Sequence, residues 1–192
     1  NQLAELPPEI GDLPNLTDLI LKSNRLTSLP PDIGRLNQLK ELHLSGNPIT
    51  KLPPDIGDLT NLRELDLSGA KLTELPTEIG NLSHLSDLNL VDNSLTTLPV
   101  DIGNLHNLTG LHLSHNRYLA VLPREVFNLT SLRELSLPGH DTAVPPEISN
   151  LANLEELYIG HGPLKALPPE IGDLPNLSTL NVFATFLERL PP

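Results

Sequence analysis

Leucine recurs with a fixed spacing along almost the whole chain. The same frame of leucines repeats every 23 residues, apart from one unit of 24 residues at 108–131 and a following unit of 22. A period of roughly 20 to 50 residues is typical of solenoids, in which each unit buries its apolar face only against its neighbours. We therefore expect one continuous array over residues 1–192, with partial repeats at 1–15 and 177–192. The full repeats start at residues 16, 39, 62, 85, 108, 132 and 154.

Each unit contains two different local patterns. In the second unit, Leu42 and Leu44 alternate with polar residues, which predicts a short strand with its leucines on one face. Farther along, Pro53-Pro54 is followed by Ile56-Gly57. Proline suits the first turn of a helix and glycine ends one, so this stretch predicts a short helical or 3₁₀ turn. Stacked units of this kind predict an α/β fold with a parallel sheet on one side and the turns on the other.

The run LxxLxLxxNxL, followed by LPxxIGxLxNL, resembles the leucine-rich repeat family over essentially the whole chain. Its 23-residue LPxxI form is similar to the repeats of intracellular Ras-group proteins and of many bacterial proteins. The resemblance implies a right-handed solenoid with a concave parallel β-sheet and short helical or 3₁₀ turns on the convex side. It also implies a non-catalytic role in protein–protein interaction. Neither end of the sequence carries a recognisable cap, so we expect flanking modules in a longer protein.

Asparagine occupies the ninth position of several units, where its side chain can satisfy buried backbone groups of the turn. This structural ladder is expected to comprise Asn24, Asn47, Asn93 and Asn116. Ala70 and Gly162 stand at the same position without an amide, which predicts a bridging water or local loosening there, whereas His140 and Thr185 keep polar atoms. The stretch 137–145 lacks a core leucine and is expected to bend the solenoid.

One outward-facing position of the predicted strands is acidic in six of eight units. This acidic column consists of Asp18, Glu41, Glu64, Asp87, Glu134 and Glu156, with Gly110 and Thr179 at the two other places. Neighbouring strands lie about 4.8 Å apart, so adjacent carboxylates repel by roughly 1 kcal/mol in bulk water. A basic partner would relieve this repulsion. The alternative is a self-paired face, in which Lys40, Arg63 and Arg133 neutralise the column.

Histidines and aromatic residues complete the candidate binding surface, because aromatic side chains are typical hot spots of interfaces. The candidate contacts outside the acidic column are His43, Asp66, His112, His115, Tyr158, His161 and Phe183. For Phe183, with Phe186 beyond it, the alternative is packing against a C-terminal cap.

The net charge of −12 opposes binding to nucleic acid or to anionic lipid, which attract clustered Lys and Arg. No run of 18 apolar residues indicates membrane insertion. We therefore expect a protein partner with a basic surface; the sequence does not indicate an oligomeric state. There is no Walker loop, GxSxG or CxxC motif, and an open sheet offers no water-excluding cleft. The sequence thus predicts no catalytic residue and no cofactor.

The histidines of the later units are also candidate ligands of a metal site. His112 and His115 are three residues apart, but His140 takes the inward ladder position, whereas His115 and His161 are expected about 10 Å apart, two repeats from each other. Zinc needs three or four ligands within about 2.0–2.3 Å. We therefore expect no metal site.

Two alternatives remain open. The array is also compatible with substrate recognition in a larger enzyme, because similar arrays are joined to ubiquitin-ligase, kinase or GTPase modules. Glycosylation sequons favour an extracellular receptor ectodomain; they lie at Asn15, Asn81, Asn107, Asn128 and Asn176. Such sequons arise, however, whenever the Asn-Leu of the repeat is followed by Ser or Thr, and cysteine is absent. We therefore favour a cytoplasmic protein, or one secreted into a host cytoplasm if it is bacterial.

Overall fold

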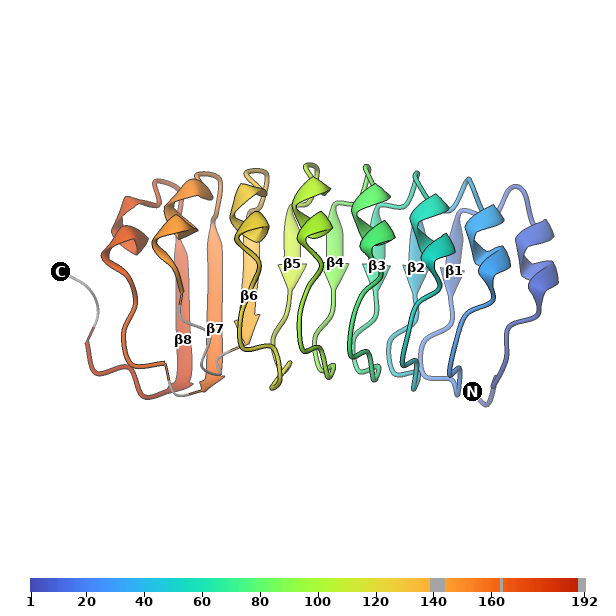
Figure 1. Ribbon diagram of the computed structural model, residues 1–192, viewed down its shortest axis with the longest axis horizontal. Coiled ribbons are helices and arrows are strands. Elements are labelled where there is room, and N and C mark those ends of the chain that lie inside the picture. The colour runs from blue at the N-terminus through green and yellow to red at the C-terminus, as the bar shows by residue number, and fades with distance from the viewer. Residues whose placement is uncertain (139–143, 163, 190–192) are drawn as a thin grey trace.

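The computed structural model describes residues 1–138, 144–162 and 164–189. These residues form eight strands of one parallel sheet in chain order, and each strand follows a 3₁₀ helix (Figure 1). The strands are β1 (Asp18–Ile20), β2 (Glu41–His43), β3 (Glu64–Asp66), β4 (Asp87–Asn89), β5 (Gly110–His112), β6 (Glu134–Pro138), β7 (Glu156–Gly162) and β8 (Thr179–Thr185). The predicted α/β leucine-repeat solenoid is confirmed.

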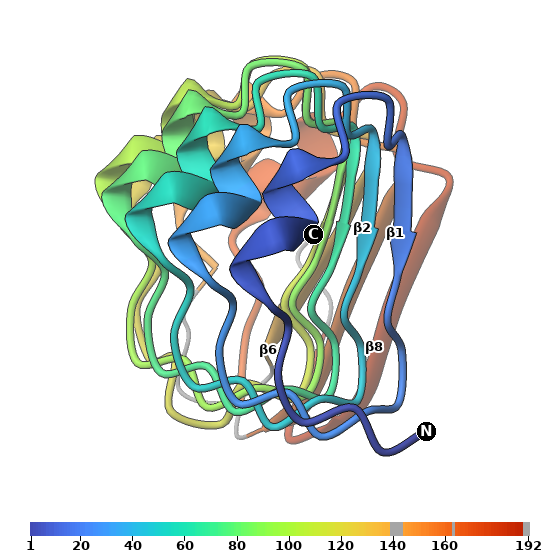
Figure 2. The ribbon, with the colours of Figure 1, turned by 90° about the vertical axis from the view of Figure 1, so that its right-hand side faces the viewer.

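The array is curved, with the sheet on its concave side. Viewed along the array, β1 and β8 at the two ends project beyond the middle strands on the sheet side, while the helices of the middle units bulge outward (Figure 2). The curvature follows from the two layers, because a sheet sets neighbouring units about 4.8 Å apart whereas the helical turns behind it are bulkier.

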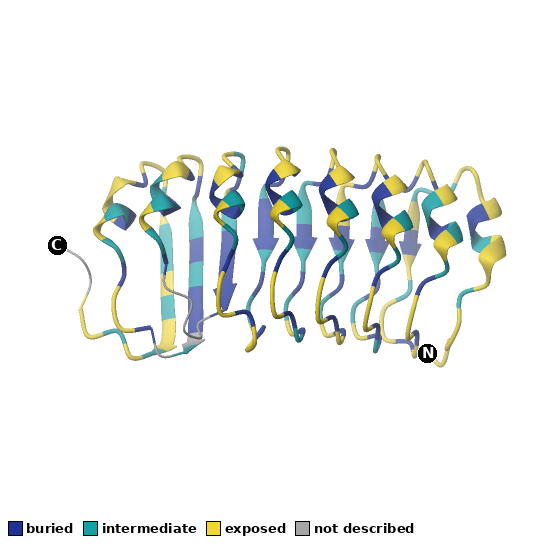
Figure 3. Cartoon of the chain, in the orientation of Figure 1, coloured by how far each residue is buried: buried dark blue, intermediate teal, exposed yellow. Residues whose placement is uncertain are grey.

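Leucine and isoleucine side chains fill the space between the sheet and the 3₁₀ layer. Leu42, Leu65 and Leu88, at the centres of three strands, have no exposed surface. Figure 3 shows that buried residues occur both in the strands and in the 3₁₀ helices. Phe127, at the place where most units have glycine, is the largest fully buried side chain among the described residues.

In the described residues, eight 3₁₀ helices of five residues line the convex side, each preceded by a proline in extended conformation. They are η1 (Pro8–Asp12), η2 (Pro31–Arg35), η3 (Pro54–Asp58), η4 (Thr77–Asn81), η5 (Val100–Asn104), η6 (Arg124–Asn128), η7 (Pro146–Asn150) and η8 (Pro169–Asp173).

The motif glycines lie inside these helices, so the expectation that they end the helix is wrong. Gly57 is the fourth residue of η3, and a Cβ atom there would lie 2.6 Å from the backbone oxygen of Glu78 in the next helix. Gly11, Gly34 and Gly80 make the same close approach to the following helix. Glycine is therefore required because neighbouring 3₁₀ helices stack in backbone contact.

The ladder asparagines hydrogen-bond to backbone groups of two successive units. Asn47 donates from Nδ2 to the carbonyl oxygens of Leu21 at 2.9 Å and Leu44 at 2.8 Å, and its Oδ1 accepts from the amide of Leu26 at 3.1 Å. Asn93 and Asn116 repeat the pattern, while Asn24 bonds to the partial first unit. These bonds tie each turn to the turn before it.

The expected water or loosening at Ala70 is wrong, because neighbouring groups take over the bonds of the missing amide. The amide of Ile49 donates to the carbonyl of Asn47 at 2.8 Å, and the carbonyl of Leu67 accepts from Asn93 at 2.9 Å. Gly162, the other gap in the ladder, lies in β7 and pairs with Thr185. The predicted bend at 137–145 and the ladder role of His140 involve residues 139–143, which lie outside the described residues.

In five units a residue in the left-handed region directly precedes the ladder position, three residues after the end of the strand. Gly46 and Gly69 have φ values of 69° and 64°, and Ser23, Asp92 and His115 have values of 54°, 55° and 61°. Asp and His tolerate this conformation better than most residues with a Cβ atom. His115 therefore has a backbone role in the turn that follows β5.

Candidate functional site

The sheet places the acidic column in register across the concave face. Asp18 pairs with Glu41, Glu41 with Glu64, and Glu64 with Asp87, and after Gly110 the column continues with Glu134 opposite Glu156. Strand pairing at about 4.8 Å therefore aligns like charges.

The flanking cations make no ion pair with this column within the described residues. Arg133 donates to Glu155 at 2.9 Å, on the strand's flank, and not to Glu134 or Glu156. Within the described part of the chain, Lys40 and Arg63 form no ion pair. None of these three side chains therefore pairs with a carboxylate of the acidic column in the described structure.

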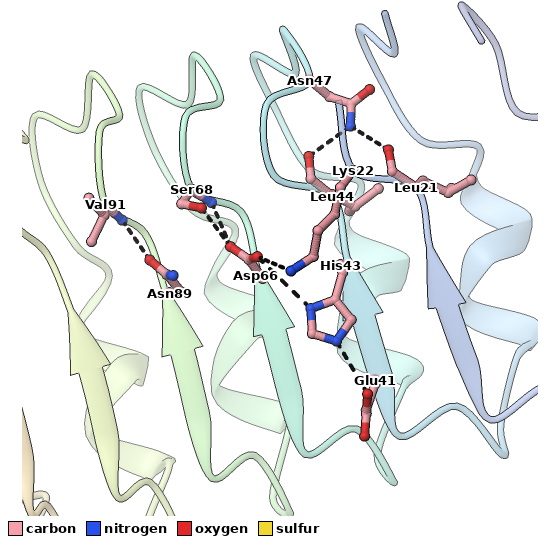
Figure 4. Close-up of polar contacts among 10 residues, drawn as sticks. All are labelled: Leu21, Lys22, Glu41, His43, Leu44, Asn47, Asp66, Ser68, Asn89 and Val91. Carbon is pink, nitrogen blue, oxygen red and sulfur yellow. Dashed lines mark hydrogen bonds and ion pairs between the residues drawn. The ribbon is translucent and has the colours of Figure 1, made fainter. Parts of the chain in front are cut away.

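A first cluster of polar contacts surrounds His43, and Figure 4 shows it on β2 and β3. The Nε2 atom of His43 lies 3.3 Å from Oε2 of Glu41, and its Nδ1 atom lies 3.9 Å from Oδ2 of Asp66. Nδ1 is buried and has no hydrogen-bond partner. The imidazole thus stands between two carboxylates on neighbouring strands.

Asp66 is held in place from two sides. Lys22 Nζ lies 3.1 Å from Oδ2, and Ser68 donates to Oδ1 from its hydroxyl at 2.7 Å and from its amide at 3.1 Å. Burial by itself raises the pKa of Asp66, but the hydrogen bonds from Ser68, Lys22 and Ser45 outweigh it and lower the pKa below its ordinary value. Asp66 is therefore an ionised, fixed carboxylate beside His43.

A second cluster surrounds His112 on β5. Its Nε2 atom lies 3.2 Å from Oδ2 of Asp87, and its Nδ1 atom lies 3.6 Å from Oε1 of Glu134. The hydrogen bond to Asp87 raises the pKa of His112 above its ordinary value; burial opposes the increase, and the charges of Asp87, Glu134 and Asp66 add to it. The raised pKa makes His112 easier to protonate than an ordinary histidine.

The aromatic candidates lie at the C-terminal end of the sheet. The hydroxyl of Tyr158 donates to Glu156, and this bond raises the pKa of Tyr158, with smaller contributions from burial and from the charges of Glu156 and Glu134. Phe183 lies against Gly160 on the neighbouring strand, where a Cβ atom would be 2.4 Å from its ring. Phe183 is 37% exposed and Phe186 is 71% exposed. The side chain of His161 lies outside the described residues.

One group of side chains has the composition of a metal site, and the sequence analysis missed it. Glu41, His43 and Glu64 offer ligand atoms that all lie within 4.8 Å of one another. The expectation of no metal site concerned only the histidines of the later units. The signal was present in the sequence, because Glu41-x-His43 places both side chains on one strand face and Glu64 follows Glu41 by one repeat.

A second series of polar side chains ties the flanks of neighbouring units together. Asn61, Asn107, Asn153 and Asn176 each donate from Nδ2 to a backbone oxygen of the preceding unit at 2.7–2.8 Å. Two of these, Asn107 and Asn176, belong to the sequons noted above. Their amide groups therefore have a structural use in the repeat.

Family comparison now identifies the array. The model of the family described as "Leucine-rich repeat region" matches residues 1–70, 31–90 and 73–163. The chain belongs to the leucine-rich repeat family. Leucine-rich repeat arrays are protein-interaction modules that typically have no enzymatic activity of their own.

Solved structures of leucine-rich repeat proteins superpose on most of this chain. A leucine-rich repeat protein of Leptospira interrogans is 34% identical, with a TM-score of 0.57 over 100% of this chain and 60% of that chain. The ectodomain of the Arabidopsis receptor kinase HAESA, in complex with an IDA peptide hormone, is 30% identical, with a TM-score of 0.83 over 95% of this chain and 32% of that one. The repeat domain of the type III effector XopL is 27% identical, with a TM-score of 0.76 over 95% and 65%.

The chain spans 60% of the Leptospira protein and about a third of the receptor ectodomain. No curated protein matches the sequence. None of the helices formed by the described residues is long and apolar enough to cross a membrane.

Proposed function

We propose that this array is a non-catalytic protein-binding module whose concave face takes a partner with a basic surface. The observation that carries the proposal is the acidic column, which runs in register across the sheet and receives no ion pair from Lys40, Arg63 or Arg133 in the described structure. Bringing cations onto this face removes the repulsion between aligned carboxylates, so electrostatics favour a basic partner and accelerate its association.

The proposed contact surface extends beyond the acidic column along the same face. Its histidines and Tyr158 supply hydrogen-bonding groups next to the carboxylates, and Phe183 supplies apolar area at the C-terminal end. The complete proposed set is Asp18, Glu41, His43, Glu64, Asp66, Asp87, His112, His115, Glu134, Glu156, Tyr158, His161 and Phe183. No cofactor, nucleic acid or membrane insertion belongs to this proposal.

We place the protein in the cytoplasm, or in a host cytoplasm if it is a secreted bacterial protein. Two of the sequon asparagines support this location, since the amides of Asn107 and Asn176 are engaged in bonds between repeats. A glycan on either amide would compete with such a bond. The likeness to the receptor ectodomain favours the alternative of an extracellular peptide receptor, and the likeness to the effector domain favours substrate recognition within a larger protein.

The test compares two triple charge reversals with the same change in net charge. The first, Glu41→Lys, Glu64→Lys and Asp87→Lys, reverses the centre of the acidic column. The control, Glu9→Lys, Asp58→Lys and Asp173→Lys, reverses exposed carboxylates on η1, η3 and η8. Both variants and the parent are immobilised, and captured proteins are identified by mass spectrometry and then titrated calorimetrically as purified proteins. EDTA is present throughout, so that no metal ion contributes.

We expect the parent and the control to capture the same basic protein, and the column variant to lose it. Circular dichroism establishes that all three are folded. Equal binding by the column variant would exclude the acidic column as the binding surface, and loss with the control variant as well would show that only overall charge matters.

A further inference from the structure

We propose that Glu41, His43 and Glu64 form a binding site for a divalent transition-metal ion such as Zn²⁺. This inference is independent of the proposed protein partner, and it reverses the expectation from the sequence that the chain has no metal site. It rests on the geometry of three side chains on two neighbouring strands and on the environment of the histidine between them.

The three side chains converge on one point of the concave face. Glu41 and Glu64 are directly paired across β2 and β3, and His43 lies two residues beyond Glu41 on the same face of its strand. Their ligand atoms all lie within 4.8 Å of one another. The backbone that carries them belongs to a sheet in which Leu42 and Leu65 are fully buried. The ligands therefore project from a rigid support, as a binding site requires.

The separations fit tetrahedral coordination after a small closing movement. Two ligand atoms held about 2.0–2.1 Å from a tetrahedral zinc ion are about 3.3–3.4 Å apart. The Nε2 atom of His43 already lies 3.3 Å from Oε2 of Glu41. Glu64 is exposed, so its carboxylate is free to rotate inward. Three protein ligands leave a fourth position for water or for a group from a partner.

The second nitrogen of His43 provides an independent reason for a metal. Its Nδ1 atom is buried without a hydrogen-bond partner and faces Oδ2 of Asp66 at 3.9 Å. In a neutral imidazole whose proton lies on Nε2 toward Glu41, Nδ1 is an acceptor that faces another acceptor. A metal ion on Nε2 places the proton on Nδ1, which then donates toward Asp66. A carboxylate behind a histidine ligand is the usual arrangement at protein metal sites.

Asp66 is positioned for this role before any metal binds. Lys22 and Ser68 hold its carboxylate on the side of His43 away from Glu41 (Figure 4). The ligand set of one imidazole and two carboxylates favours zinc and similar transition metals over Mg²⁺ or Ca²⁺, which prefer oxygen ligands only. Paired carboxylates on adjacent strands add the negative charge that a divalent cation needs.

His112 provides a matched control on the same sheet. It also stands between two carboxylates, Asp87 at 3.2 Å and Glu134 at 3.6 Å, but no third ligand group converges there within the described residues. A protonated imidazole satisfies that arrangement without a metal. A protonated imidazole is also the alternative explanation for the position of His43 between Glu41 and Asp66. The zinc titration distinguishes this explanation from metal binding.

The experiment is a calorimetric titration of the EDTA-treated, dialysed protein with ZnCl₂ at neutral pH, repeated with CoCl₂ while visible absorption is recorded. We expect one metal ion per chain and the absorption bands of tetrahedral cobalt. His43→Ala and Glu64→Gln should abolish this binding, and Asp66→Asn should weaken it by roughly 10- to 100-fold. His112→Ala should bind like the parent. Excess Mg²⁺ should not compete.

Absence of stoichiometric zinc binding in the parent would overturn the proposal, and so would binding that survives in both Glu64→Gln and His43→Ala. Loss of binding in His112→Ala alone would move the site to β5 and equally overturn it. Glu64→Gln changes an exposed side chain, so it keeps the test valid if His43→Ala does not fold. A higher melting temperature with zinc in the parent, and not in Glu64→Gln, gives a second readout.

Discussion

The carboxylate of Asp87 reaches across Gly110 to His112, with Oδ2 and Nε2 3.2 Å apart. The contact joins β4 to β5 diagonally and requires the missing side chain at residue 110, because a Cβ atom there would lie 2.4 Å from the same carboxylate oxygen. Glycine therefore interrupts the acidic column where the Asp87 side chain crosses to the histidine of the next strand.

The first prediction concerns the pH dependence of stability. The pKa of His112 is raised in the folded protein, mainly by its hydrogen bond to Asp87. Its contribution to stability is therefore fully present below the ordinary pKa of 6.5 and is lost as pH rises through the raised folded value. Urea unfolding of the parent and of His112→Gln should differ most on the acid side of this window and converge above it. A constant difference across the pH series would contradict the assignment. His106→Gln, at an exposed position, serves as the control.

The second prediction tests the space at residue 110. Gly110→Ala should displace the Asp87 carboxylate and lower the pKa of His112 toward its ordinary value. Because only the end of a flexible side chain must move, the free energy of unfolding should change by less than about 1 kcal/mol. An NMR titration of the imidazole measures the first effect and urea unfolding measures the second. The prediction fails if His112 titrates as it does in the parent.

The third prediction compares the effect on stability of replacing two glycines that occupy the same motif position. Gly57→Ala should lower the free energy of unfolding by about 1–3 kcal/mol, since its Cβ atom would meet the backbone oxygen of Glu78 at 2.6 Å. Gly172→Ala should be neutral or stabilising by up to about 1 kcal/mol, because nothing lies within 4 Å of its Cβ position. Chemical unfolding measures both variants. Equal losses would mean that backbone conformation, and not stacking, requires glycine here.

The fourth prediction compares a ladder asparagine, Asn47, with Asn61, one of the flank asparagines that bond to the preceding unit. Asn47 is fully buried and makes three hydrogen bonds to the backbone, so Asn47→Ala should cost about 2–4 kcal/mol. Asn61 makes one exposed bond, to the carbonyl of Asn37 at 2.7 Å, and Asn61→Ala should cost about 0.5–1.5 kcal/mol. Thermal and urea unfolding measure both losses, and a smaller loss at Asn47 would show that neighbouring amides compensate, as they do around Ala70.

The register of the repeats could be predicted from the sequence, and with it much of the fold. A constant period places Leu42, Leu65 and Leu88 at the same height of successive units, because each unit stacks on the last with the same geometry. The same argument aligned Glu41 with Glu64. Which residues share a column depends only on the spacing of the repeat. The concave face and its acidic column could therefore be predicted from the sequence.

Contacts between columns were decided by the tertiary structure. Side-chain rotamers select whether Arg133 pairs with Glu155 or with the column, and whether His43 stands between Glu41 and Asp66. The required glycine at 57 likewise depends on how closely η3 and η4 approach. These outcomes arise from competition among charges, hydrogen bonds and packing over a few ångströms, whereas the repeat period specifies only which residues are neighbours.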